Sequence, residues 1–94
     1  MKVRWTNPAV AALAKIHAHI ATFNPAAANL LRDRALVYVE TKLAAHPMIG
    51  RPGRVDDTRE SVILPSYIIV YRVAGGVVEI LAVGHVARTW PEVF

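Results

Sequence analysis

The sequence predicts an α+β fold in which an N-terminal strand and an antiparallel two-helix hairpin precede a small, mainly antiparallel sheet, with both helices on one sheet face. Three observations support this prediction. Apolar residues recur every three or four positions in the first half. Three runs rich in Val, Ile and Tyr follow in the second half. Pro and Gly separate these segments. The chain has 94 residues, which suits a single domain over residues 1–94.

The first half predicts a short strand over residues 2–6 and then two helices. Asn7-Pro8 opens the first helix, because Thr6 or Asn7 can cap it and Pro suits a first helical turn. Asn24-Pro25 ends that helix and opens the second, which is expected over residues 25–45. The residues predicted to face inward are Leu13, Ile16, Ile20 and Phe23 on the first helix, and Ala28, Leu31, Ala35, Val39 and Leu43 on the second. So short a break between two helices predicts an antiparallel hairpin.

The second half predicts three strands after a turn-rich connection. The connection is expected over residues 46–53 and the strands over residues 58–64, 67–73 and 77–84. Ala74-Gly75-Gly76 suits the turn of a hairpin. Alternation places Tyr67, Ile69, Tyr71 and Val73 toward the helices, with Ile68, Val70 and Arg72 on the other face. That other face is expected to be at least partly open, and we expect function there.

The high apolar content and the positive charge of the chain predict that it binds another macromolecule. Hydrophobic residues make up 54% of the chain and charged residues 19%. A small domain cannot bury so much apolar surface, so part of it is expected outside, under a permanent partner or a second copy. The net charge is +4, and eight of the eleven basic residues are Arg. Such a balance fits nucleic acid and an acidic protein partner equally well.

Several classes of protein are excluded. The chain has no Cys, so it has no disulfide, thiolate nucleophile or thiolate metal ligand. No His and carboxylate pair has the spacing of metal ligands, and we expect neither a metal nor a cofactor. The first residues lack the apolar core of a secretory signal, and no apolar run approaches the roughly 20 residues of a membrane span. A cytoplasmic protein is the expectation.

Several short motifs occur together in a specific order and spacing. They are Asn24-Pro25 with Ala27-Ala28, His46-Pro47, Gly50 to Arg54, Thr58-Arg59-Glu60, Ile69 to Val73, Val78 to Leu81, and His85 to Pro91. In this order the chain resembles the RelE/ParE superfamily of bacterial type II toxin–antitoxin toxins over nearly its whole length. The resemblance implies a toxin neutralised by a small, commonly acidic antitoxin that wraps the helices and sheet.

Apolar and cationic residues at predicted surface positions are the candidates for contact with a partner. They are Leu30, Leu36, Val37, Arg51, Arg54, Arg72, Trp90 and Phe94. The three helical residues exceed what a solvated helix face needs, and large aromatics in the tail need a groove or a partner to cover them. Two of the arginines, Arg51 and Arg54, fit a solvated turn equally well. Arg72 has an alternative, a cross-strand pair with Glu79.

The resemblance leaves two mechanisms open, and it favours one of them. ParE-like members bind DNA gyrase, which needs a surface and no reacting groups, whereas RelE-like members cut messenger RNA on the ribosome. The nuclease members carry an Arg where this chain has Ile68 and a basic residue where it has Val86. This departure favours a gyrase inhibitor that is not an enzyme. The alternative is an endoribonuclease that uses Arg59, Arg72, His85 and Arg88. A third possibility is a family member that only binds an antitoxin.

Overall fold

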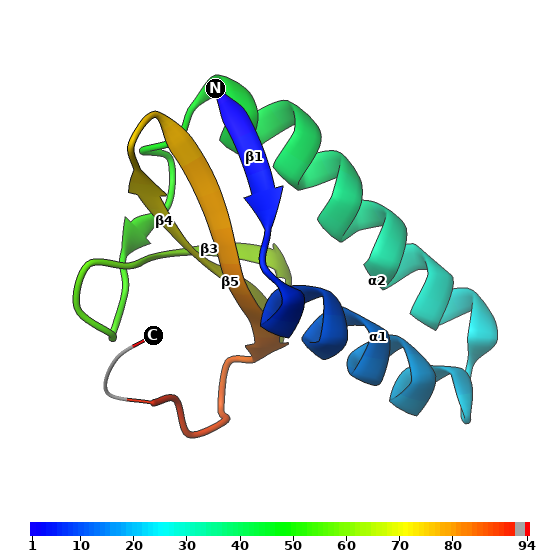
Figure 1. The fold of residues 1–94 in the computed structure, drawn as a ribbon. Helices are drawn as coiled ribbons and strands as arrows, with labels where there is room; N and C mark the ends of the chain where they lie inside the picture. The colour runs from blue at the N-terminus through cyan, green and yellow to red at the C-terminus, as the bar shows by residue number, and fades with distance from the viewer. Residues whose placement is uncertain (92–93) are drawn as a thin grey trace.

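The computed structural model describes residues 1–91 and 94, and the predicted strand, two helices and three further strands occur in the predicted order (Figure 1). A short additional strand over residues 51–52 lies within the connection expected over residues 46–53 and was not predicted. The elements are β1 (Lys2–Trp5), α1 (Asn7–Ala21), α2 (Pro25–Tyr38), the π-helical turn η1 (Val39–Leu43), β2 (Arg51–Pro52), β3 (Arg59–Leu64), β4 (Tyr67–Ala74) and β5 (Val77–His85). The strands lie in the order β1-β5-β4-β3-β2. β1 runs parallel to β5, and every other pair is antiparallel. The predicted α+β class and the mainly antiparallel sheet are confirmed.

Both helices begin with a side-chain cap followed by Pro. The Thr6 hydroxyl accepts a hydrogen bond from the backbone N–H of Ala9 at 3.3 Å, and the Asn24 side chain accepts one from Ala27 at 3.0 Å. The second helix continues through η1 to residue 45, as predicted. The π-helical turn itself was not predicted, because it adds one residue to a helical turn without breaking the apolar stripe.

The main core lies between the helices and one face of the sheet. The inward stripe predicted for α2 is confirmed, since Ala28, Leu31, Ala35, Val39 and Leu43 are all buried. They pack with others such as Leu13, Ile69, Tyr71 and Ile80. The prediction for Phe23 was wrong, because that side chain is 79% exposed. α1 ends at residue 21, so Phe23 lies in the interhelical turn with its ring edge-on to His19.

A β-bulge in β5 adjusts the alternation on the sheet. Val70 lies opposite Ala82, but the next residue, Tyr71, lies opposite Ile80, so Leu81 is the additional residue. Because of this bulge, both Ile80 and Val83 belong to the core under the helices. The predicted facing of Ile69 and Tyr71 toward the helices is confirmed.

The face away from the helices is only partly open. Ile68, Val70 and Ala82 are buried there in a second, small cluster, which Val86 and Trp90 cover. Figure 1 shows the segment after β5 on the side of the sheet away from the helices. The Trp90 ring packs directly on the backbone of β5, since a Cβ on Gly84 would lie 2.9 Å from it. Sequence alternation could not show this cover, because it comes from outside the strands.

Candidate partner-binding surfaces

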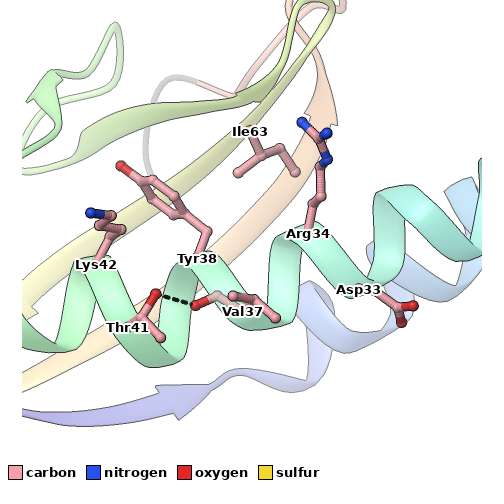
Figure 2. Close-up of a pocket in the computed structure, with 7 residues that line it drawn as sticks. All are labelled: Asp33, Arg34, Val37, Tyr38, Thr41, Lys42 and Ile63. Atoms are coloured by element: carbon pink, nitrogen blue, oxygen red, sulfur yellow. Dashed lines mark hydrogen bonds between the residues drawn. The ribbon is translucent and has the colours of Figure 1, made fainter.

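An apolar groove lies between α2 and β3 (Figure 2). It measures about 400 Å³ and is lined by Asp33, Arg34, Val37, Tyr38, Thr41, Lys42 and Ile63. Arg34, Tyr38 and Lys42 project from one side of the helix toward the strand. Val37 is 61% exposed beside them, with its carbonyl accepting the Thr41 hydroxyl at 2.6 Å. The groove therefore offers apolar surface with charged residues at its rim.

The strand edge beside this groove is unpaired over most of its length. β2 contains two residues and pairs only with Arg59 and Glu60 of β3. Residues 61–64 of β3 consequently have a partner strand on one side alone, where β4 lies. Open backbone donors and acceptors next to an apolar groove suit the addition of an extended peptide as a further strand.

A second hollow lies between the outer sides of the two helices. Its lining includes Val10, His17, Arg32 and Leu36. Leu36 is 40% exposed there, and Leu30 on the same helix is 50% exposed. The structure thus places the three helical residues predicted for partner contact, Leu30, Leu36 and Val37, at the surface of the helical layer. Their role in binding stays a prediction.

Arg51 and Arg54 lie around a buried carboxylate that the sequence analysis had not singled out. The Glu60 side chain is 3% exposed, and its two oxygens accept from Nη2 of Arg51 at 3.2 Å and from Nε of Arg54 at 3.2 Å. The backbone N–H of Arg54 adds a bond of 2.9 Å. Burial alone would raise the pKa of Glu60, but these hydrogen bonds and the guanidinium charges outweigh it and hold that pKa below its ordinary value. Both arginines therefore stabilise the fold besides flanking a turn.

The Trp90 side chain is also largely covered by other residues of the same chain. Its ring lies 4.1 Å from the guanidinium carbon of Arg88 and 5.8 Å from that of Arg54. Arg54 in turn donates from Nη1 to the Val86 carbonyl at 3.0 Å. Phe94 lies 6.4 Å from the Trp90 ring, centroid to centroid, and is 39% exposed. Of the two tail aromatics, only Phe94 retains substantial exposed surface.

The four candidate nuclease residues do not converge on one site. Arg59 lies opposite Tyr71 on the helix side of the sheet, and its Nη1 donates to the Gly50 carbonyl at 2.7 Å and to the Met48 carbonyl at 3.3 Å. Arg72 follows Tyr71 and faces the other side. His85 lies opposite Tyr67, which is four residues, or about 13 Å, along β4 from Tyr71.

Of the four candidate nuclease residues, only His85 and Arg88 line the same surface hollow. It measures about 440 Å³ and also contains Lys15, His19 and Tyr67. The His85 ring stands edge-on to Tyr67 at 5.5 Å, and its Nδ1 accepts the backbone N–H of Ala87 at 3.1 Å.

Arg72 does not pair with Glu79 in the structure. The two residues are cross-strand neighbours, but the Glu79 carboxylate bonds to Arg4 instead. The Nε of Arg72 is buried and has no hydrogen bond within the part of the chain that the structure describes. The proposed cross-strand pair was therefore wrong, because the parallel neighbour Arg4 on β1 reaches the same carboxylate.

Across residues 1–91 and 94, no helix combines the length and apolar character that crossing a membrane requires. Over the same residues, His, Asp and Glu side chains do not gather in threes as a metal site would need.

Comparison with known proteins agrees with this architecture. A solved structure described as "Chromosomal ParDE TA system from P. aeruginosa" matches with a TM-score of 0.77 and 27% identity, over 92% of this chain and 96% of the matched chain. Toxin RelE2 of Caulobacter vibrioides is 38% identical over 87 residues, which cover 93% of this chain and 97% of that protein. The protein Y4kP of Sinorhizobium fredii is 42% identical over 93 residues, covering 98% and 95% respectively.

The fold and these relatives define a toxin of the RelE/ParE superfamily. Residues 3–90 match the family described as the ParE toxin of the type II toxin-antitoxin system, parDE. The chain belongs to this ParE toxin family.

Proposed function

We propose that this toxin inhibits DNA gyrase in the cytoplasm and is held inactive by a cognate antitoxin. Membership of the ParE toxin family supports a toxin of a type II pair. The solved relative is described as a ParDE system, which supports an antitoxin partner. The observation that favours gyrase over RNA is the dispersal of Arg59, Arg72 and His85 described above.

Cleavage of RNA by its own 2′-hydroxyl needs a base, an acid and cations around one phosphate. In this chain the Arg59 guanidinium is bonded to loop carbonyls, and Arg72 lies on the opposite sheet face. The two positions where a cation would complete a nuclease set are apolar. Ile68 is fully buried in the second apolar cluster, and Val86 packs against that cluster together with Trp90. Binding to gyrase requires a complementary surface and none of these groups.

The helical layer supports the proposal of an antitoxin. Leu30, Leu36 and Val37 expose apolar area that water would otherwise contact, and a bound segment would bury it. The groove beside the open edge of β3 would add backbone hydrogen bonds. Arg34 and Lys42 at its rim complement an acidic partner.

Two assays on the purified toxin test the target. We expect gyrase supercoiling to be blocked, with cleaved DNA accumulating, and we expect antitoxin to reverse both effects. The same preparation, added to translating ribosomes, should leave messenger RNA intact. Unimpaired supercoiling together with ribosome-dependent RNA cleavage would contradict the proposal.

One observation favours the second candidate, an endoribonuclease. His85 and Arg88 share a hollow with Lys15 and His19, so two imidazole rings and two cations could face a phosphate. On this hypothesis His85→Ala abolishes RNA cleavage and toxicity while antitoxin binding persists. A folded chain that binds antitoxin but affects neither gyrase nor ribosomes would instead support a pure binding module.

A further inference from the structure

We infer that the sheet face away from the helices binds the phosphate backbone of duplex DNA. The inference rests on the proposed function, because gyrase acts on duplex DNA and the toxin would meet that DNA in the complex. The toxin would then contact the DNA that gyrase holds as well as the gyrase protein.

The observation behind it is the distribution of charge. Six cations belong to this face or to the segments that cover it: Lys2, Arg4, Arg51, Arg54, Arg72 and Arg88. Only two side-chain carboxylates of the described strands face the same way, Glu60 and Glu79. The other five cations of the chain share the rest of the described surface with four carboxylates. Among the side chains of residues 1–91 and 94, this face therefore carries the larger excess of positive charge.

The cations are spread across the full width of the sheet. Register places Arg4, Glu79 and Arg72 side by side on β1, β5 and β4. Arg51 on β2 marks the opposite edge. Four strand spacings separate β1 from β2, about 19 Å in all. This span matches roughly six base pairs of a duplex, at 3.4 Å per step along each strand.

The two carboxylates orient the cations and do not neutralise them all. Glu79 holds Arg4, and Glu60 holds Arg51 and Arg54. Within residues 1–91 and 94, Lys2 and Arg72 form no ion pair, and Arg72 keeps a buried Nε without a hydrogen bond. These side chains can donate to phosphate oxygens without breaking an existing bond.

This face exposes few large apolar residues, Val62 on the strands and Phe94 in the segment that covers them, which favours DNA over a protein partner. Val62 is the one large apolar residue of the five strands that is prominently exposed, whereas the helices expose Val10, Leu30, Leu36 and Val37. Protein interfaces have apolar or aromatic centres, whereas DNA interfaces are more polar and far more positive. Trp90 is no stacking platform for a single strand, because Arg88 and the sheet cover its ring.

A matched pair of double variants tests this inference on the full chain. Lys2→Gln with Arg72→Gln removes two charges from the sheet face, and Arg34→Gln with Lys42→Gln removes two from the helical layer. The probe is a fluorescent DNA duplex of mixed sequence, and the measurement is its anisotropy between about 50 and 200 mM salt. The sheet-face variant should bind about tenfold or more weakly, with a salt slope flatter by about two. The helical-layer variant should stay within about threefold of the parent.

Three outcomes would overturn the inference: no binding at low salt, equal losses in both variants, or a sheet-face variant that keeps DNA binding but loses binding to DNA-free gyrase. The last would make the face a protein contact. The supercoiling assay runs in parallel on the same proteins. If the parent blocks gyrase but does not bind DNA, this inference fails and the proposed function stands.

Discussion

Glu60 on β3 and Arg54 in the loop before it are joined twice, because one carboxylate oxygen accepts both the backbone N–H and the Nε–H of Arg54, at 2.9 and 3.2 Å. Arg54 also donates to the Val86 carbonyl beyond β5. A single buried carboxylate thereby connects the loop, the edge of the sheet and the segment that covers the second apolar cluster. Its removal should loosen all three.

Glu60→Gln should destabilise the fold by about 1–3 kcal/mol at neutral pH, because two guanidinium groups lose their counter-charge in a buried site. Urea unfolding measures the change. Glu40→Gln is the control, since Glu40 is exposed and should change stability by about 0.5 kcal/mol at most. Equal effects of the two substitutions would show that the ion pairs add nothing.

The same carboxylate predicts how stability depends on pH. The pKa of Glu60 is lowered in the folded state, so its contribution is complete above the ordinary value of 4.5 and is lost as pH falls through the lower folded value. The stability difference between the parent and Glu60→Gln should therefore be constant at neutral pH and shrink below about pH 4.5. Urea titrations at several acidic pH values check this. A difference that persists undiminished in acid contradicts it.

Gly84→Ala should displace the covering segment, because the new Cβ would lie 2.9 Å from the Trp90 ring and 3.1 Å from Cδ of Arg88. We expect a cost of about 1–3 kcal/mol, typical of overpacking. A double-mutant cycle isolates the cause. In a Trp90→Ala background the substitution should cost little, since the ring is gone and the Arg88 side chain can move. An unchanged cost in that background would place the strain elsewhere.

Tyr71→Phe should cost about 1–3 kcal/mol, because it leaves a buried backbone group without a partner. The Tyr71 hydroxyl accepts from the Gly50 N–H at 2.8 Å and donates to the Pro47 carbonyl at 2.8 Å. It thus fastens the connection after the second helix to the core. Thermal unfolding would measure the loss, with Tyr67→Phe as the control. That hydroxyl makes no hydrogen bond within the described residues, so a comparable loss there would argue against the proposed cause.

Val37→Gln should weaken antitoxin binding at least tenfold without changing stability, because Val37 is exposed in the apolar groove beside β3. Titration calorimetry against the cognate antitoxin gives the affinity. Phe23→Gln is the control, since Phe23 is also exposed, at 79%, but lies in the interhelical turn and does not line this groove. If both variants bind equally well, the antitoxin does not use this groove.

The fold could be predicted largely because each element has a local signal. Asn-Pro pairs mark both helix starts, and the α2 stripe from Ala28 to Leu43 follows helical spacing. The errors concern features without such a signal. Phe23 fits the helical period but falls beyond the end of α1, and the bulge at Leu81 depends on pairing with β4.

The candidate surfaces were harder to predict than the fold. The exposure of Leu30, Leu36 and Val37 follows from their positions on a helix whose opposite side is buried. In contrast, Glu60 is an acidic residue between Arg59 and Ser61, and nothing in its neighbourhood in the sequence indicates burial. Its environment depends on how the loop folds back to place Arg54 six residues away on the carboxylate, and on the distant contact of Arg54 with Trp90.

The parallel pairing of β1 with β5 bears on how the toxin is made. Lys2 on β1 pairs with Val77 on β5, so the first strand to leave the ribosome cannot form its hydrogen bonds until a strand 75 residues later has been synthesised. Until β5 emerges, β1 has no partner strand and the cations of β1 and β4 cannot come together. Completion of the sheet, and with it the grouping of these cations, therefore comes only when nearly the whole polypeptide has been synthesised.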